Sequence, residues 1–100
     1  MATKKKARVV RSSGNVFADL GFSHEEAEHL KIRSALMAAI VKLIKVRKLT
    51  QSSAAALFGV SQPRISDLVR GRIDLFSIDT LVEMLSKADV RVELRVPQVA

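Results

Sequence analysis

Residues 49–71 read LTQSSAAALFGVSQPRISDLVRG, and they contain the clearest local signals for the fold. Thr50 is a favourable N-cap for a short helix from Gln51 to Phe58, because a Thr hydroxyl can accept a hydrogen bond from a free N–H of the first turn. Gly59 follows, and glycine most readily takes the positive φ angle found at helix ends. The first half of the stretch therefore predicts a short helix that ends in a sharp turn.

A second short helix is expected after this turn. Ser61 can cap it, Pro63 suits its first turn because no N–H is needed there, and Gly71 ends it. Two short helices that cross steeply need a small residue at their closest approach, which Ala55 supplies. The apolar residues that would then point into a shared core are Ala54, Phe58, Val60, Ile65 and Leu68. The spacing predicts a helix-turn-helix motif over residues 50–70.

The other face of the second helix is polar and free to enter the major groove of DNA. The candidates for base contact on or beside this face are Gln62, Pro63, Arg64, Ser66 and Asp67. Gln62 can form paired hydrogen bonds with an adenine edge, whereas Pro63 offers only apolar contact, for example to a thymine methyl group. Arg64 either reads guanine or contacts a phosphate, and Asp67 either accepts from cytosine or pairs with Arg70.

Further polar and basic residues flank the motif, where they would position the protein on the DNA backbone without reading sequence. The candidates for phosphate contact are Lys48, Thr50, Gln51, Ser61, Arg70 and Arg72. The alternative for the three basic residues of this set is that they are ordinary solvated side chains.

Positive charge is concentrated in two parts of the 100-residue chain, whose formal net charge is +7. Residues 42–72 hold seven basic residues and one acidic residue, and residues 1–11 hold five basic residues and no acidic residue. Such clustering suits a polyanion, although a soluble basic protein without a nucleic-acid role is an alternative. We expect residues 1–14 to form a basic, disordered tail that is a DNA arm, a protein-binding segment or neither.

Helical patterns lie on both sides of the motif. Ser23 and Glu26 form a capping box, and apolar residues recur at helical spacing over residues 24–47. Because this stretch is longer than most globular helices, we expect a break near residues 33–34. Ser77 can cap a further helix.

The periodicity changes from 3.6 to 2 near the C-terminus, in residues 90–100. The apolar residues that alternate with charged ones there are Val90, Val92, Leu94 and Val96. They predict one β-strand with one apolar face. Nothing else in the chain is a strong strand, so a second copy is the simplest partner. We assign these four residues and Glu93 to a dimer interface.

The charges of this strand restrict its register. In an antiparallel dimer with Glu93 opposite its own copy, Arg91 would also face Arg95 and like charges would stack. A shift by two residues keeps the apolar face and pairs Arg91 with Glu93, or Glu93 with Arg95. We expect one of these two shifted registers.

Several classes of function are not expected. Cysteine is absent, so nothing suggests an oxidising compartment, and the cytoplasm is the default location. No apolar run approaches the roughly 20 residues that span a membrane.

Two histidines and three glutamates lie within residues 24–29, but the acids also suit a helix N-terminus, so we expect no metal ion. We likewise expect no cofactor and no catalytic activity, since neither a phosphate-binding loop nor a nucleophile arrangement is visible.

The motif resembles the helix-turn-helix of the Xre (Cro/C1-type) family of bacterial and phage regulators. The residues that match the family pattern are Leu49, Thr50, Gln51, Ala55, Gly59, Val60, Ser61, Ile65, Ser66 and Gly71. The resemblance implies that Gln51 contacts a phosphate and braces Gln62. It also implies a mainly α fold, a lambda-repressor-like bundle of about five helices over residues 15–89, to which the sequence adds one C-terminal β-strand that pairs across a dimer.

The flanks narrow the resemblance. The segments NVFADLGF and RGRIDLFSIDTLVEML, with the terminal strand, are similar to HigA-type antitoxins of type II toxin-antitoxin systems. This implies a homodimer that binds a palindromic operator in double-stranded DNA, represses its own operon and neutralises a RelE/HigB-like toxin. Ala88 and Asp89 depart from the pattern, since relatives often place glycine before the strand. The alternatives are a stand-alone Xre-type repressor and a protein-binding inhibitor in which the motif is only a scaffold.

Overall fold

The computed structural model describes residues 15–97, and the predicted tail at residues 1–14 lies outside the described residues. The described chain is mainly helical. Its elements are α1 (Val16–Asp19), α2 (His24–Val46), α3 (Gln51–Phe58), α4 (Gln62–Val69), the short 3₁₀ helix η2 (Ile73–Leu75) and α5 (Ile78–Lys87). The expectation of about five helices is confirmed for this part of the chain.

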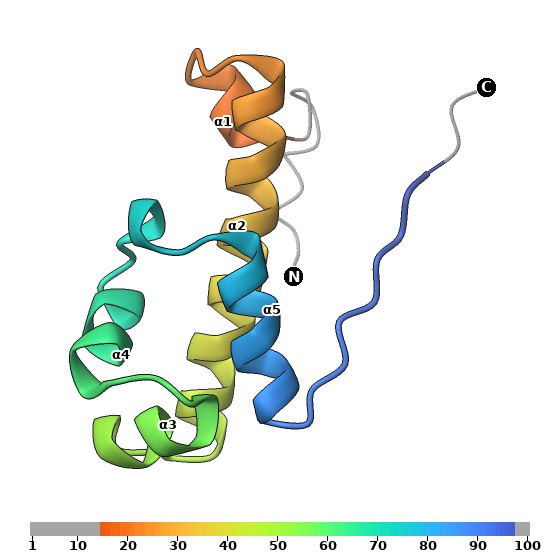
Figure 1. Ribbon diagram of the computed structural model, residues 1–100. Coiled ribbons are helices and arrows are strands. Elements are labelled where there is room, and N and C mark those ends of the chain that lie inside the picture. The colour runs from red at the N-terminus through yellow and green to blue at the C-terminus, as the bar shows by residue number, and fades with distance from the viewer. Residues whose placement is uncertain (1–14, 98–100) are drawn as a thin grey trace, which may run out of the picture.

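The long helix α2 is the support on which the other helices pack. Figure 1 shows α3, α4 and α5 gathered around its C-terminal half, with α1 against its N-terminal end. The fully buried large side chains of the core are Phe58, Phe76, Ile40, Ile65, Leu68, Leu81, Met84 and Leu85. The predicted inward face of the motif is confirmed, because Ala54 is also buried and Val60 packs against the same core.

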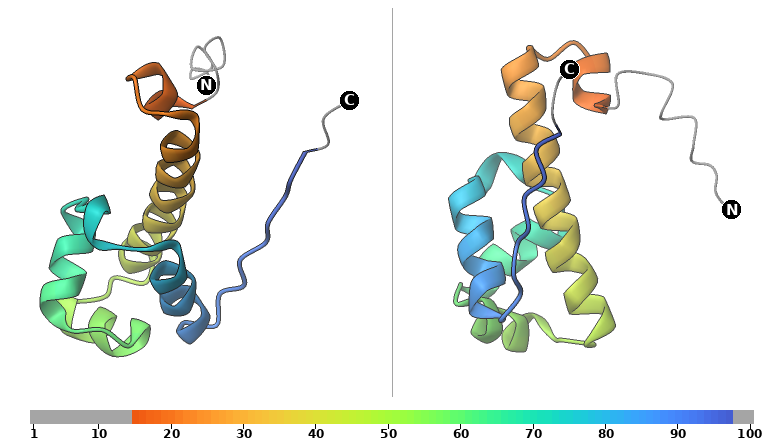
Figure 2. Two further views of the ribbon diagram at one scale, coloured as in Figure 1. Left: turned by 45° about the horizontal axis from the view of Figure 1, so that its top comes forward. Right: turned by 90° about the vertical axis from the view of Figure 1, so that its right-hand side faces the viewer.

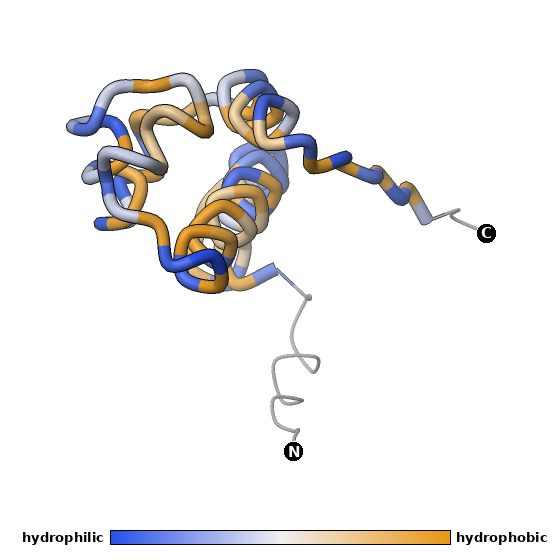
Figure 3. Tube along the Cα trace, turned by 90° about the horizontal axis from the view of Figure 1, so that it is seen from below, coloured by the Kyte–Doolittle hydropathy of each residue, from blue (hydrophilic) through white to orange (hydrophobic). Residues whose placement is uncertain are grey.

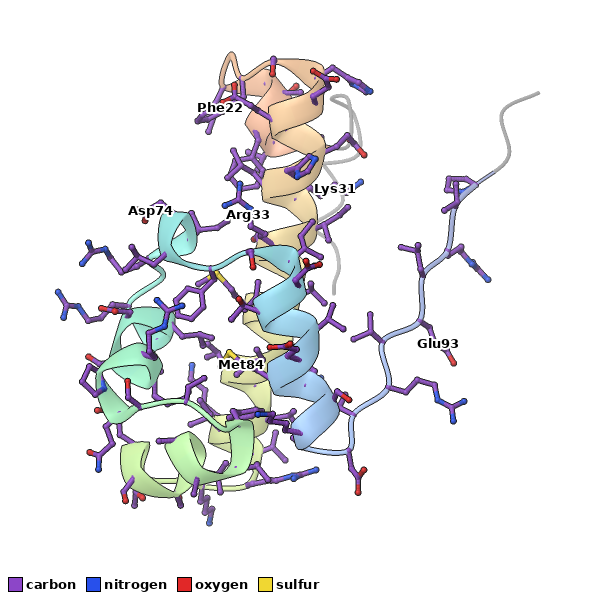
Figure 4. The ribbon with its side chains drawn as sticks, in the orientation of Figure 1. Phe22, Lys31, Arg33, Asp74, Met84 and Glu93 are labelled. Atoms are coloured by element: carbon purple, nitrogen blue, oxygen red, sulfur yellow. The ribbon has the colours of Figure 1, made fainter. Side chains whose placement is uncertain are left out.

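The prediction of a break in α2 is wrong. The helix runs without interruption through 23 residues, and the capping bond predicted at its start is present, with the Ser23 hydroxyl accepting from the N–H of Glu26. It contains no Gly or Pro that would interrupt it, and Met37 and Ile40, which follow the expected break, are buried in the core. In addition, Arg33 donates a hydrogen bond to the carbonyl of Ile73, which ties α2 to η2 (Figure 4).

The N-terminal end of α2 is covered by α1. Asn15, which is 6% exposed, caps α1 by accepting from the N–H of Phe17, and its amide donates to the carbonyl of Ala27 at 3.0 Å. The ring of Phe17 meets that of Phe22 edge to face. Interactions distant in sequence therefore hold the short α1 in place, since four residues cannot form a stable helix alone.

Both ends of the helix-turn-helix turn have the predicted geometry. Thr50 caps α3, and its partner in the capping box is Ser53. Gly59 ends α3 with a φ of 70°, and a Cβ at this position would lie 2.6 Å from the side chain of Lys87. Ser61 caps α4. The turn therefore needs glycine for its backbone angle, whereas the exposed end of the Lys87 side chain can move aside.

Two non-glycine residues occupy the left-handed region at helix ends. Lys48, with a φ of 53°, follows α2, and the N–H of Leu49 then donates to the carbonyl of Ile44 at 2.9 Å. Asp89, with a φ of 62°, follows α5. Asp89 thus adopts the backbone angle for which glycine is favoured, so the departure noted in the sequence leaves the turn itself intact.

We expect Lys48→Gly to raise the free energy of unfolding by about 1 kcal/mol, because a left-handed φ costs a residue with a Cβ roughly this much. Urea denaturation measures the change. Arg47→Gly is the control, since Arg47 has a φ of −87° and glycine there should lower stability. An equal effect of the two substitutions would contradict this explanation.

The expected C-terminal strand is not formed in the single chain. Residues 90–97 follow α5 as an extended segment without regular secondary structure. Val90 still packs against the core, and Figures 1 and 2 show the rest of the segment extending away from the helices. A strand needs a neighbouring strand to pair its N–H and C=O groups, and residues 15–97 contain no other strand. The apolar and polar alternation remains visible along the trace in Figure 3. Figure 4 shows Glu93 pointing away from the bundle.

None of the helices within residues 15–97 is both long enough and apolar enough to cross a membrane.

Candidate nucleic-acid interface

The first turns of α3 and α4 are accessible to solvent. Thr50 and Gln51 are exposed at the start of α3, and Ser61 and Gln62 are exposed at the start of α4. Each cap hydroxyl accepts one N–H, at 3.0 Å in α3 and 3.4 Å in α4. A helix start has several N–H groups without an intrahelical partner and a partial positive charge, so both ends are suited to bind phosphate oxygens.

Helix α4 has a buried side and a polar side. Ile65 and Leu68 are 0% and 1% exposed and anchor the helix in the core. The candidates for base contact on the other side are Gln62 and Pro63, which are exposed, and Ser66 and Asp67, which are half-buried. The structure therefore presents the start of α4 outward, while its apolar side fixes the orientation of the helix.

Arg64 lies on a different side of α4 from Gln62. Its guanidinium stacks on the ring of Phe76, 4.5 Å from the ring centroid, and Phe76 is 1% exposed. Two residues along a helix differ by about 200° in direction, so Arg64 points away from the side on which Gln62 lies. In this conformation Arg64 connects α4 to the segment before α5 and does not project beside Gln62.

We expect a double-mutant cycle of Arg64→Ala and Phe76→Leu to give a coupling free energy of about 0.5–2 kcal/mol, as for a cation over an aromatic ring. The measurement is urea denaturation of the parent, both single variants and the double variant. A residue that only reads a base would show no such coupling in the absence of DNA, so additive losses would contradict the stacking role.

The three basic candidates for phosphate contact lie at the two ends of the motif. Lys48 is exposed just before α3, and Arg70 and Arg72 are exposed just after α4. Gly71, with a φ of 77°, turns the chain between the two arginines, and the N–H of Arg72 donates to the carbonyl of Asp67. The turn after α4 is therefore held by backbone bonds, and the long basic side chains extend from it into solvent.

Phe76 is the residue that sequence reasoning missed. Phe76 lies outside the motif. In the sequence it resembles an ordinary core residue, because no local pattern connects it to Arg64. The acidic and histidine side chains near the start of α2 do not converge, since within residues 15–97 no three His, Asp or Glu side chains are placed to hold a metal ion.

Two capped helices joined by a tight turn, with the second helix anchored in a core and its start exposed, define a helix-turn-helix domain of the kind that binds DNA. A family model described as a helix-turn-helix domain matches residues 16–97. The chain therefore belongs to this helix-turn-helix family, and the match includes the segments on both sides of the motif.

A solved structure indicates which kind of helix-turn-helix domain this is. The chain is 30% identical to a protein whose name places it among XRE family transcriptional regulators, with a TM-score of 0.68. The similarity covers 74% of this chain and 83% of that protein. The domain is thus an Xre-type helix-turn-helix. No curated protein matches the chain.

Proposed function

We propose that this protein is a sequence-specific transcriptional regulator that binds a palindromic operator in double-stranded DNA as a symmetric dimer. The observation that carries the proposal is the exposed start of α4, with Gln62 at its first position, held outward by buried Ile65 and Leu68. A helix of this kind fits the major groove, where base edges are distinguishable.

In the proposed complex the motif divides into base-reading and positioning residues. The base-reading residues are Gln62, Pro63, Ser66 and Asp67, and Gln62 would bond the edge of an adenine. The positioning residues are Lys48, Thr50, Gln51, Ser61, Arg70 and Arg72, with the free N–H groups of α3 and α4. The stacking of Arg64 on Phe76 argues against the reading of guanine by Arg64.

Footprinting on the DNA upstream of the protein's own gene tests this proposal. Two recognition helices on a symmetric dimer would enter successive major grooves about 34 Å apart. We expect two protected half-sites with this separation, related by a palindrome. A single protected half-site, or uniform protection along the fragment, would contradict it.

The proposed dimer is formed by the C-terminal segments. Val92, Leu94 and Val96 are 39%, 78% and 75% exposed in the single chain, which leaves an apolar row without a cover. Antiparallel pairing with a second copy would bury this row together with Val90 and satisfy the backbone of both segments. Charge pairing favours the registers that place Glu93 opposite Arg91 or Arg95.

Single cysteines test the register, because the native chain has none. Pairing of Arg91 with Glu93 places Val92 opposite its own copy, whereas pairing of Glu93 with Arg95 does the same for Leu94. Under mild oxidation we therefore expect either Val92→Cys or Leu94→Cys to form a disulfide-linked dimer. Preferential cross-linking of Glu93→Cys would contradict both registers.

We further propose that the regulator is the antitoxin of a type II toxin-antitoxin pair that neutralises a RelE/HigB-like toxin. The support is the similarity of both flanks of the motif to HigA-type antitoxins. Co-expression with a RelE-like toxin encoded beside it should restore growth, and Gln62→Ala should restore growth equally while losing the operator. If growth were not restored, the antitoxin role would be contradicted, and the protein would be a stand-alone repressor.

A further inference from the structure

An apolar groove lies between α2 and the end of α4, and it reaches Gly71, which is flanked by the phosphate-contact candidates Arg70 and Arg72. Its volume is about 600 Å³. Met37 and Leu68 line it and are almost fully buried, while Val46 and Val69, which line it too, remain exposed. Such an uncovered apolar hollow on a small domain is unfavourable in water and is typical of a binding surface.

The charged residues that line this groove are all basic. Lys42 and Lys45 line it and are both exposed, and no acidic residue is among the lining residues. Residues three apart on a helix are neighbours on one face, so the two ammonium groups form one positive edge beside the apolar floor.

The dimensions favour a helix as the occupant. The lining residues of α2 extend from Ser34 to Val46, which corresponds to about 18 Å, or roughly three helical turns. We propose that this groove binds an amphipathic helix of a partner protein, with apolar residues on the floor and acidic residues against Lys42 and Lys45.

The charge argues against segments of this chain as occupants. Residues 1–11 carry five basic residues and no acidic residue, so the positive edge would repel them. Residues 90–97 carry two arginines and one glutamate, which gives them a net positive charge as well. A partner helix with acidic flanks is the occupant that satisfies both the apolar floor and the charged edge.

The groove is separate from the residues proposed to read DNA. None of the base-reading candidates Gln62, Pro63, Ser66 and Asp67 lines it. The partner helix and the bases of the operator would therefore contact different residues, and the two kinds of binding can be measured separately.

A synthetic helical peptide of about 14 residues, with leucines on one face and glutamates on both sides of them, tests the proposal. We expect saturable binding by fluorescence anisotropy, and no binding when lysines replace the glutamates. Lys42→Gln with Lys45→Gln should weaken binding by about tenfold, because two charge pairs are lost. Lys31→Gln with Arg47→Gln changes the net charge equally outside the lining residues and should leave the affinity unchanged.

Ala38→Gln supplies a steric test that does not alter charge. Ala38 lines the groove and is exposed, so glutamine fills the groove without disturbing the core. We expect this variant to lose the peptide and to keep the operator affinity of the parent. Equal binding of both peptides, or full peptide affinity in Ala38→Gln, would overturn the proposal. A dimer that Ala38→Gln converts to monomers in sedimentation would overturn it in favour of a second copy.

Discussion

Gln62→Ala is expected to weaken operator binding by about 2–6 kcal/mol, since a paired hydrogen bond to a base contributes about 1–3 kcal/mol and a dimer loses two of them. This corresponds to a loss from about 30-fold to 10⁴-fold in affinity. Gln62 is exposed at the first position of α4, and its removal touches no core residue, so the fold should be unaffected. Anisotropy titrations on operator and scrambled DNA measure the change.

The control is Arg70→Gln, since Arg70 is exposed just after α4. Because Arg70 is proposed to contact a phosphate and no base, its loss should weaken binding to operator and scrambled DNA by the same factor. Gln62→Ala should instead act on the operator alone. If both variants reduced both affinities equally, Gln62 would not be a base-reading residue.

Operator affinity should fall by about 10³ when monovalent salt is raised from 50 to 200 mM. Lys48, Arg70 and Arg72 of two protomers would neutralise six phosphates, and each contributes about −0.9 to the slope of log K against log salt. The expected slope is therefore about −5. A slope near −1 at operator DNA would contradict the proposed contacts of these three residues.

The same salt titration can assign the phosphate contacts to particular residues. Arg70→Gln with Arg72→Gln should make the slope shallower by about 4 units, because a dimer loses four phosphate contacts. Lys31→Gln is the control, since Figure 4 shows Lys31 on α2, far from the motif. The salt slope of this variant should match that of the parent protein.

The motif could be predicted from sequence because its signals are local. Thr50 and Ser61 are caps, Gly59 takes a positive φ, and the apolar residues between them face one core, as expected. Each of these features depends on residues within one or two helical turns. The bounds of α3, Gln51–Phe58, agree with the prediction for the same reason.

Features that depend on distant residues could not be predicted in this way. Length alone suggested a break in α2, but the helix is uninterrupted, and its contacts with the core and with Ile73 are to residues distant in sequence. The stacking of Arg64 on Phe76 joins residues that no local pattern connects. Residues 90–96 have the alternation of a strand, but a strand requires a partner, which the single chain does not supply.

If this domain recognises a specific DNA sequence, the purified protein should prefer DNA from the region upstream of its own gene, and titration on that DNA measures the preference. Scrambled DNA of equal length is the control, at salt near 150 mM, where non-specific binding is typically no tighter than about 10⁻⁶ M. We predict an operator complex at least about 10³ tighter than the complex with scrambled DNA. Equal affinities for the two DNAs, both removed by salt, would contradict sequence-specific recognition.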